Sequence, residues 1–243
     1  MTNHSCCTRR HVLAIGAAAT LLPMPTVSAS DFPREVAGVE IPRSTVTVKA
    51  AAYARASYPD FLFNHCMRTF LFGALMMKKN SISYNADEAF TAAVLHDLGL
   101  LIAFESAQGS FEVDGADAAE KFALSQGLAQ TDADRIWHAV VFHDGRWAIT
   151  RRAGAEAMLV SAGAGADVVG PGDDFDARQV VEIVGAFPRL QFKKKFIQIA
   201  IDHCKRKPQS QRGTWLEGLC REQVPSAFAD TTERQISTAP FVE

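Results

Sequence analysis

A histidine and an aspartate stand side by side inside a strongly apolar stretch of this chain. They are His96 and Asp97, and the run from Ala92 to Leu101 reads Ala-Ala-Val-Leu-His-Asp-Leu-Gly-Leu-Leu. A buried polar group needs a partner, and a buried charge needs a counter-charge or a metal. An imidazole and a carboxylate that converge on one divalent cation would meet both needs. The pair therefore favours a fold that brings further ligands to it.

Two further ligand candidates lie far from the pair in the sequence. His65 stands in Phe-Asn-His-Cys, and Asp167 stands in Ala-Gly-Ala-Asp. A His-Asp dipeptide is common by chance, and an isolated histidine on an apolar helix face is more often a packed core residue. Gly99, however, stands where the C-cap of a helix is expected. The four residues together predict a metal site.

The remainder of the chain has the pattern of helices. Apolar residues recur at three-to-four spacing, and Pro59 suits the first turn of a helix. Thr131 with Asp134 is a capping-box-like start, and only Val46–Val48 looks extended and β-branched. The stretch 154–169 is rich in Ala and Gly, which implies close helix packing. Helices are expected at about 59–79, 85–99, 114–127, 131–143, 154–169, 176–187, 190–207 and 214–223.

These elements predict an all-α fold, a single helical bundle with an extended N-terminal arm. The 243 residues and their 48% hydrophobic content fit one domain with a full core. We expect the arm at residues 30–52, the domain at 53–225, and a C-terminal tail at 226–243 that is a surface strap or disordered.

Residues 1–29 have the order of a signal peptide. Arg9-Arg10 precedes the apolar stretch Val12–Leu22, and a small-residue cleavage site ends at Ala29. The alternative is a fortuitous Arg-Arg near an apolar N-terminus. The twin-arginine interpretation predicts export of an already folded protein to the periplasm or the outside, with no membrane attachment after removal of the signal.

Charge and cysteine content narrow the classes of partner. A net charge of −2 and a pI near 6.4 give no electrostatic case for binding nucleic acid or anionic membranes. The cluster Lys193–Lys195 is expected on a solvated helix face. Cys66, Cys204 and Cys220 remain after signal removal. They lack the C-x-x-C spacing that is typical of a zinc site. Cys204 and Cys220 can pair in an oxidising compartment, although the sequence does not require it.

The order His, His-Asp, Asp on helical segments resembles the HD-domain metal-dependent hydrolase superfamily. Several stretches are similar to its cyanamide hydratase-like branch: Leu62–Thr69, Leu95–Gly99 and Phe111–Ala119, followed by Trp137–His143, Ala162–Asp167 and Phe187–Arg189. The resemblance implies His65, His96, Asp97 and Asp167 as metal ligands. His143 matches a family histidine near the metal and the substrate. Relatives usually carry Thr where this chain has Asp144, so their substrate need not carry over.

The implied chemistry is hydration or hydrolysis with one divalent metal ion, Zn or alternatively Fe or Mn. A metal lowers the pKa of bound water toward ~7, so that a metal-bound hydroxide can attack an electrophilic carbon or phosphorus. Asp97 and His143 are the catalytic candidates. His143 either donates a proton to the developing nitrogen anion of a nitrile-like substrate or orients Asp97 or a ligand histidine.

Three residues are weaker candidates for substrate binding. Asn64 either contacts a ligand or caps a helix. Arg68 either contacts an anionic substrate or, as we favour, forms a salt bridge to Glu112 or another acidic neighbour. Asp144 lies next to the expected pocket. Glu112 is expected to be structural.

Three functions fit the sequence. The first is a metal-dependent hydratase or hydrolase acting on a small nitrile-like or C–N substrate. The second is an HD-type phosphohydrolase acting on a nucleotide or phosphoester. Such an enzyme would use His138 as a ligand of a second metal. His138 and His143 lie about 140° apart on a helix, and this separation disfavours a site that contains both. The third is a non-catalytic binding domain, which the intact ligand set disfavours. The expected partner is a small molecule, and a homo-oligomer is left open.

Overall fold

The computed structural model describes residues 32–145 and 147–240. The predicted signal peptide lies outside these residues. The described chain begins with a hairpin of two short antiparallel strands, β1 (Glu35–Val36) and β2 (Val39–Glu40), in which Glu35 pairs with Glu40. The turn at Ala37 and Gly38 has positive φ at both residues, 54° and 75°, as hairpin turns of this length require. Val36 and Val39 are buried against the helices.

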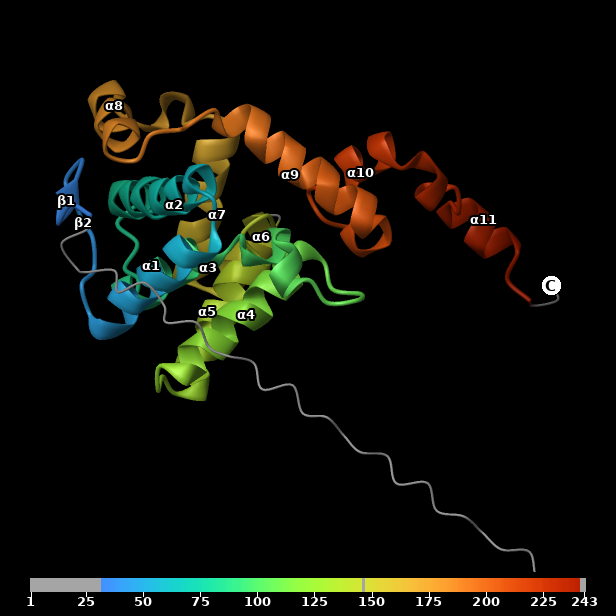
Figure 1. Cartoon of the computed structure of the whole chain (residues 1–243), viewed down its shortest axis with the longest axis horizontal. Coiled ribbons are helices and arrows are strands. Elements are labelled where there is room, and N and C mark those ends of the chain that lie inside the picture. The colour runs from blue at the N-terminus through green and yellow to red at the C-terminus, as the bar shows by residue number, and fades with distance from the viewer. Residues whose placement is uncertain (1–31, 146, 241–243) are drawn as a thin grey trace, which may run out of the picture.

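Helices make up the rest of the described fold, so the prediction of an all-α bundle is confirmed (Figure 1). The α-helices are α1 (Thr45–Ser57), α2 (Asp60–Lys79), α3 (Ala86–Leu95), α4 (Phe111–Ser125), α5 (Gln130–Val141), α6 (Trp147–Ala153), α7 (Ala155–Val169), α8 (Ala177–Ala186), α9 (Phe192–Arg206), α10 (Glu217–Gln223) and α11 (Thr232–Ser237). Short 3-10 helices are η1 (Leu98–Leu100), η2 (Ile102–Phe104), η3 (Gly172–Asp174), η4 (Pro208–Gln211) and η5 (Pro225–Phe228).

Two local expectations are wrong. Helix α1 begins at Thr45, so Val46–Val48 is helical and the extended arm stops at Ser44, not at residue 52. The Ser44 side chain caps this helix by accepting a hydrogen bond from the backbone N–H of Thr47, and the alanines that follow bury a helical face, which outweighs the β-branched residues. Helix α5 has Ala129 as its N-cap, so Thr131 lies inside the helix and is not its cap.

The expected close packing of residues 154–169 is confirmed by the contact of α7 with α2. A Cβ atom placed on Gly163 would overlap the carbonyl oxygen of Thr69, and one on Gly73 would overlap that of Leu159. The two backbones therefore approach as closely as they do because a glycine stands on each helix at the crossing. This contact fixes the distance between His65 on α2 and Asp167 on α7.

Gly99 has a different role from the expected C-cap. Helix α3 ends at Leu95, and Gly99 lies inside η1 without a positive φ. A Cβ on Gly99 would overlap the carbonyl oxygen of Phe111. The glycine is thus needed because the turn after His96 and Asp97 runs directly against the first turn of α4.

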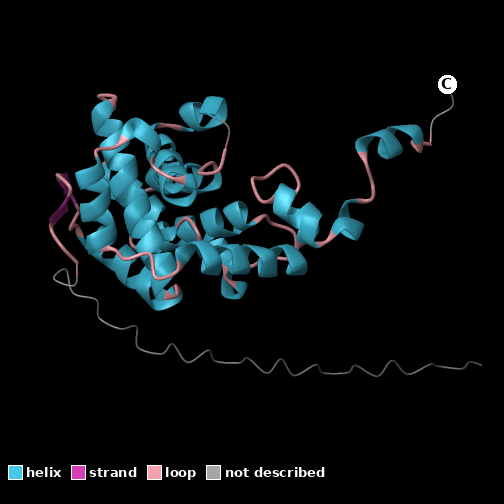
Figure 2. Cartoon of the chain, turned by 90° about the horizontal axis from the view of Figure 1, so that it is seen from above, coloured by secondary structure: helices cyan, strands magenta, loops and turns pink. Residues whose placement is uncertain are grey.

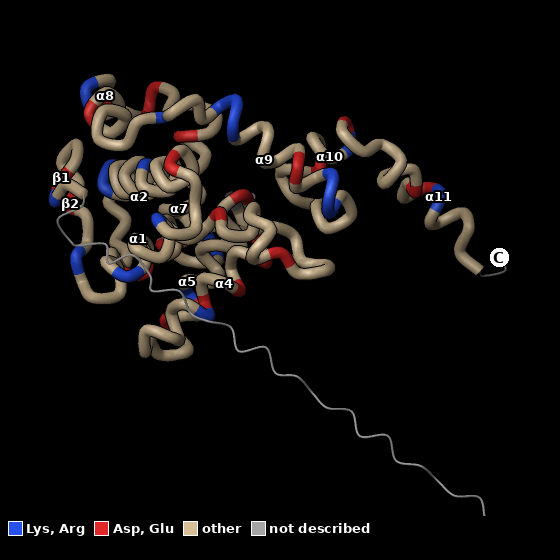
Figure 3. The backbone as a smooth tube through the Cα atoms, viewed as in Figure 1, with Lys and Arg blue, Asp and Glu red and all other residues tan. Residues whose placement is uncertain are grey.

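The C-terminal part extends away from the bundle along α9 (Figures 1 and 2). Cys204 near the end of α9 forms a disulfide with Cys220 in α10, and the expected tail contains η5 and α11. Lys193–Lys195 is exposed at the start of α9, as expected (Figure 3). Among the described residues, no helix combines the length and apolar character that a membrane span requires.

Candidate metal centre

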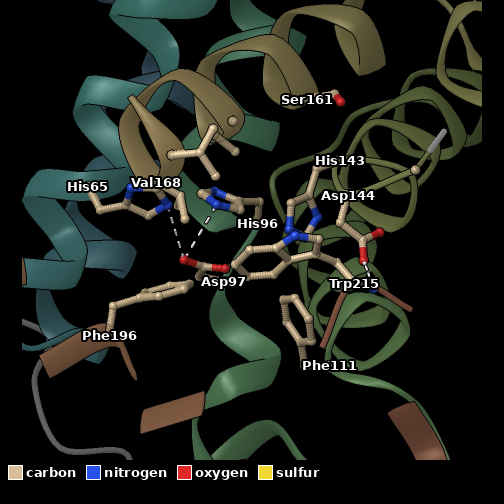
Figure 4. A pocket seen from close by; sticks show the side chains of 14 residues that line it. His65, His96, Asp97, Phe111, His143, Asp144, Ser161, Val168, Phe196 and Trp215 are labelled. Carbon is tan, nitrogen blue, oxygen red and sulfur yellow. Dashed lines mark hydrogen bonds and ion pairs between the residues drawn. The ribbon is translucent and has the colours of Figure 1, made fainter. Parts of the chain in front are cut away.

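The end of α3 brings His96 and Asp97 to the floor of a pocket, facing His65 from the second turn of α2 (Figure 4). All three residues are about 1% exposed. Asp97 Oδ2 lies 3.4 Å from Nε2 of His96 and 3.5 Å from Nε2 of His65. One potential ligand atom from each residue lies within 4.8 Å of the others. The structure therefore brings together three of the four predicted ligands.

The hydrogen bonds of the two rings determine which nitrogens are free. His96 Nδ1 lies 2.8 Å from the carbonyl oxygen of Ala93, which only accepts, so this nitrogen carries the hydrogen. His65 Nδ1 lies 2.7 Å from Asp167 Oδ2, and we assign it as the donor for the same reason. With the hydrogen on Nδ1, each ring turns Nε2 toward the Asp97 carboxylate.

Asp97 Oδ2 is buried and has no hydrogen-bond partner among the described residues. Three acceptor atoms that converge without a hydrogen between them repel one another, and a cation relieves that repulsion. Burial lowers the pKa of His96 to about 3, with smaller contributions from His143 and His65, against the opposing effect of Asp97. A ring that stays neutral at pH 7 is the form that binds metal. The residues present therefore fit a divalent metal.

Asp167 is not in this cluster. Its Oδ2 accepts from Arg68 Nη2 at 2.7 Å, and its Oδ1 accepts from Arg68 Nε at 2.8 Å and from Arg189 Nη1 at 2.6 Å. Although burial opposes ionisation, the hydrogen bonds from Arg68 and His65 hold the pKa of Asp167 well below its ordinary value. The expectation that Asp167 is a ligand is corrected, because its oxygens are engaged in orienting His65 and in pairing with the two guanidinium groups.

Arg68 and Asn64 do not reach the pocket. Arg68 is fully buried and also donates from Nη1 to the carbonyl oxygen of Phe187 at 2.8 Å, so its expected acidic partner is Asp167 and not Glu112. Asn64 Nδ2 donates to the carbonyl oxygen of Pro188 at 2.8 Å. Both side chains tie α2 to the segment before α9, and the substrate-binding assignment for them is corrected.

His143 and Asp144 do line the pocket, as predicted. His143 follows α5, and its Nδ1 lies 2.6 Å from the carbonyl oxygen of Val140, which leaves a lone pair on Nε2. Its ring centroid is 4.8 Å from that of His96. Asp144 Oδ2 accepts the backbone N–H of Trp215 at 3.0 Å.

The pocket has a volume of about 250 Å³. Sequence reasoning missed several residues that line it, because none of them is a metal-ligand or general acid–base candidate. These are Phe111, Ser161, Gly165, Val168, Phe196 and Trp215. Trp215 reaches the pocket from the segment between Cys204 and Cys220, and the only sequence signal for that placement is the pairing of these cysteines.

His138 is exposed on the far side of α5, where it stacks on Phe142 with ring centroids 6.1 Å apart. It is not part of the cluster. The expected 140° separation on one helix does not apply, because α5 ends at Val141 and His143 lies beyond it.

Comparison with known families gives one match. Residues 62–167 match the sequence model of the HD domain. This segment of the chain is therefore similar to the HD domain. The matched segment contains the three residues of the cluster, His65, His96 and Asp97, and also Asp167, which the structure pairs with Arg68 and Arg189. HD domains are metal-dependent hydrolases. No curated protein matches the chain.

Proposed function

We propose that this HD domain is a hydratase or hydrolase that uses one divalent metal on a small nitrile-like or C–N substrate. The observation that carries the proposal is the convergence of Nε2 of His65, Nε2 of His96 and Oδ2 of Asp97 at the floor of a pocket of about 250 Å³. A volume of this size suits a small substrate. The metal would be held by His65, His96 and Asp97, and would supply Lewis-acid activation of water.

His143 would move the proton in this reaction. Because its Nδ1–H is bonded to the Val140 carbonyl, Nε2 accepts a proton from water before it donates one. The proton then passes to the nitrogen of the substrate, so that the elements of water add across the C–N multiple bond and no group leaves. Phe111 and Phe196 exclude bulk water from one side of the pocket.

A phosphohydrolase remains the alternative, and the described pocket gives it less support. Phosphoryl transfer needs cations around the phosphate, and among the described lining residues there is no Lys or Arg. Arg68 and Arg189 are already paired with Asp167. A second metal through His138 would need a residue that lies on the opposite side of α5.

The test is a turnover assay of the purified protein loaded separately with Zn²⁺, Fe²⁺ and Mn²⁺. Cyanamide, short aliphatic nitriles and p-nitrophenyl phosphate are the substrates, and Asp97→Asn is the inactive control. We expect an amide or urea product from the first two classes and none from Asp97→Asn. Phosphoester turnover without nitrile turnover would overturn the proposal.

A further inference from the structure

A second cavity, of about 620 Å³, adjoins the metal pocket and shares Asp144, Gly145 and Trp215 with it. Carboxyl groups from three parts of the chain line this cavity: Glu112 of α4, Asp144 after α5, and Glu217 of α10. None of the described residues that line it is a Lys, Arg or His. A cavity with this lining carries negative charge beside the reaction site.

Glu112 has a buried carboxyl group that lies beside that of Asp144. The residue is 2% exposed, and neither of its carboxyl oxygens has a hydrogen-bond partner among the described residues. Glu217, in contrast, accepts from the backbone N–H of Gly213 at 2.7 Å and from Arg221 Nε at 2.8 Å. A buried acceptor without a donor costs free energy of folding. Glu112 is therefore the residue of this cavity that a hydrogen-bond-donating ligand would stabilise most.

The nature of that ligand follows from charge. Burial, and then the neighbouring Asp144, raise the pKa of Glu112 to about 9. At neutral pH the cation-free cavity therefore keeps a proton on Glu112, because two adjacent carboxylates repel each other. A positively charged group with several N–H donors can take the place of that proton and bond to both carboxylates.

We propose that this cavity binds the cationic end of the substrate, an ammonium or guanidinium group held between the carboxylates of Glu112 and Asp144. The lining favours an organic cation over a metal ion, because Phe142, Trp215, Val141 and Ile149 supply aromatic and apolar surface. Aromatic rings attract organic cations, whereas Ca²⁺ and Mg²⁺ require a shell of oxygen ligands.

The inference rests on the proposed function and narrows its substrate class. Asp144 lines both cavities, so the acidic cavity lies directly beside the pocket in which the C–N carbon would react. A neutral molecule such as cyanamide would supply no positive charge to the carboxyl groups of Glu112 and Asp144. The expected substrate is a nitrile or related C–N compound that also carries an amino or guanidino group.

Isothermal titration of the full chain with methylguanidinium tests the proposal, with methylurea as the uncharged isostere. The variants are Glu112→Gln and Asp144→Asn, and the control is Glu222→Gln, which removes an exposed carboxylate from α10. We expect the first two to weaken methylguanidinium binding about 10- to 100-fold, the range of a charge-assisted hydrogen bond. The control should bind as the wild type does, and methylurea should bind weakly to all of them.

Equal binding of methylguanidinium and methylurea, or unchanged binding in both Glu112→Gln and Asp144→Asn, would overturn the proposal. So would competitive displacement of methylguanidinium by Ca²⁺, which would indicate a metal site. If Glu112→Gln does not fold, Asp144→Asn alone tests the proposal, because Asp144 is only half-buried. Because binding is measured without turnover, a protein that binds methylguanidinium but hydrates no nitrile would contradict only the proposed function.

Discussion

Individual hydrogens decide the chemistry of the candidate metal centre. The carbonyl oxygens of Ala93 and Val140 fix the hydrogen on Nδ1 of His96 and His143, and Asp167 does the same for His65. Three rings therefore present Nε2 as an acceptor. Two of them lie beside Asp97, and the third, that of His143, lines the pocket where we propose that it transfers a proton.

His143→Ala should lower turnover by roughly 10²–10⁴-fold, the usual contribution of a general acid–base group. Metal content should stay the same, because His143 is not part of the three-residue cluster. Single-turnover kinetics and metal analysis of the same preparation check both outcomes. Loss of metal from His143→Ala would instead make His143 a ligand.

Glu112 should make the protein less stable as the pH rises. Its pKa is about 9 in the folded protein and lies near 4.5 in an unfolded chain. The unfolded state therefore loses the proton first, and the free energy of unfolding falls between these values by up to ~1.4 kcal/mol per pH unit. Asp144 and the paired Glu217 are the other carboxyl groups facing this cavity.

Glu112→Gln cannot ionise, so its unfolding free energy should lack this fall. Urea denaturation from pH 5 to 9 measures it, with Glu222→Gln as the exposed control. Parallel curves for Glu112→Gln and the wild type would show that Glu112 titrates normally.

At the scale of elements, the crossing of α2 and α7 sets the geometry of the site. Gly163→Ala should destabilise the protein by about 1–3 kcal/mol or more, because the added methyl group overlaps backbone of α2 that has no room to move. Gly165→Ala is the matched control, since a Cβ there meets nothing within 4 Å. It should leave stability unchanged or raise it by up to ~1 kcal/mol through helix propensity. Thermal unfolding of both variants checks the pair, and equal melting temperatures would contradict the tight crossing.

The helical pattern of the sequence was sufficient to predict most of these elements. Helix α2 and the Ala- and Gly-rich helix α7 lie within a residue or so of their expected positions, because long periodic segments bury one face whatever surrounds them. Helix α1 was missed, because Ser44 caps a segment that begins with β-branched side chains. Helices α6 and α11 also have no counterpart among the predicted helices.

The part of the site that could be predicted is the part whose residues lie close together in the sequence or on one regular helix. His96 and Asp97 are adjacent, and His65 lies on a long helix, so their convergence follows from packing two apolar faces. The pairing of Asp167 with Arg68 and Arg189 could not be read from the sequence, because it depends on three segments meeting. Trp215 was missed for the same reason, since its position depends on the Cys204–Cys220 disulfide.

At the scale of the whole molecule, that disulfide and the N-terminal twin-arginine pattern favour the same compartment. Disulfides persist in oxidising environments, so the pair Cys204–Cys220 supports the proposal of export. Replacing Arg9 and Arg10 by Lys should trap the precursor in the cytoplasm. Cell fractionation with an antibody against the mature chain measures this, and normal export of the double variant would contradict the twin-arginine interpretation.

The central claim is a metal centre formed by His65, His96 and Asp97, and metal analysis of the purified protein tests it most directly. We predict one divalent ion per chain in the wild type and in His138→Ala, and almost none in Asp97→Asn. The metal-free variant should also melt at a lower temperature, because an ion bound only to the folded state stabilises it by ~4 kcal/mol at a thousandfold excess over Kd. Full metal content in Asp97→Asn, or two ions per chain of which His138→Ala loses one, would contradict the account.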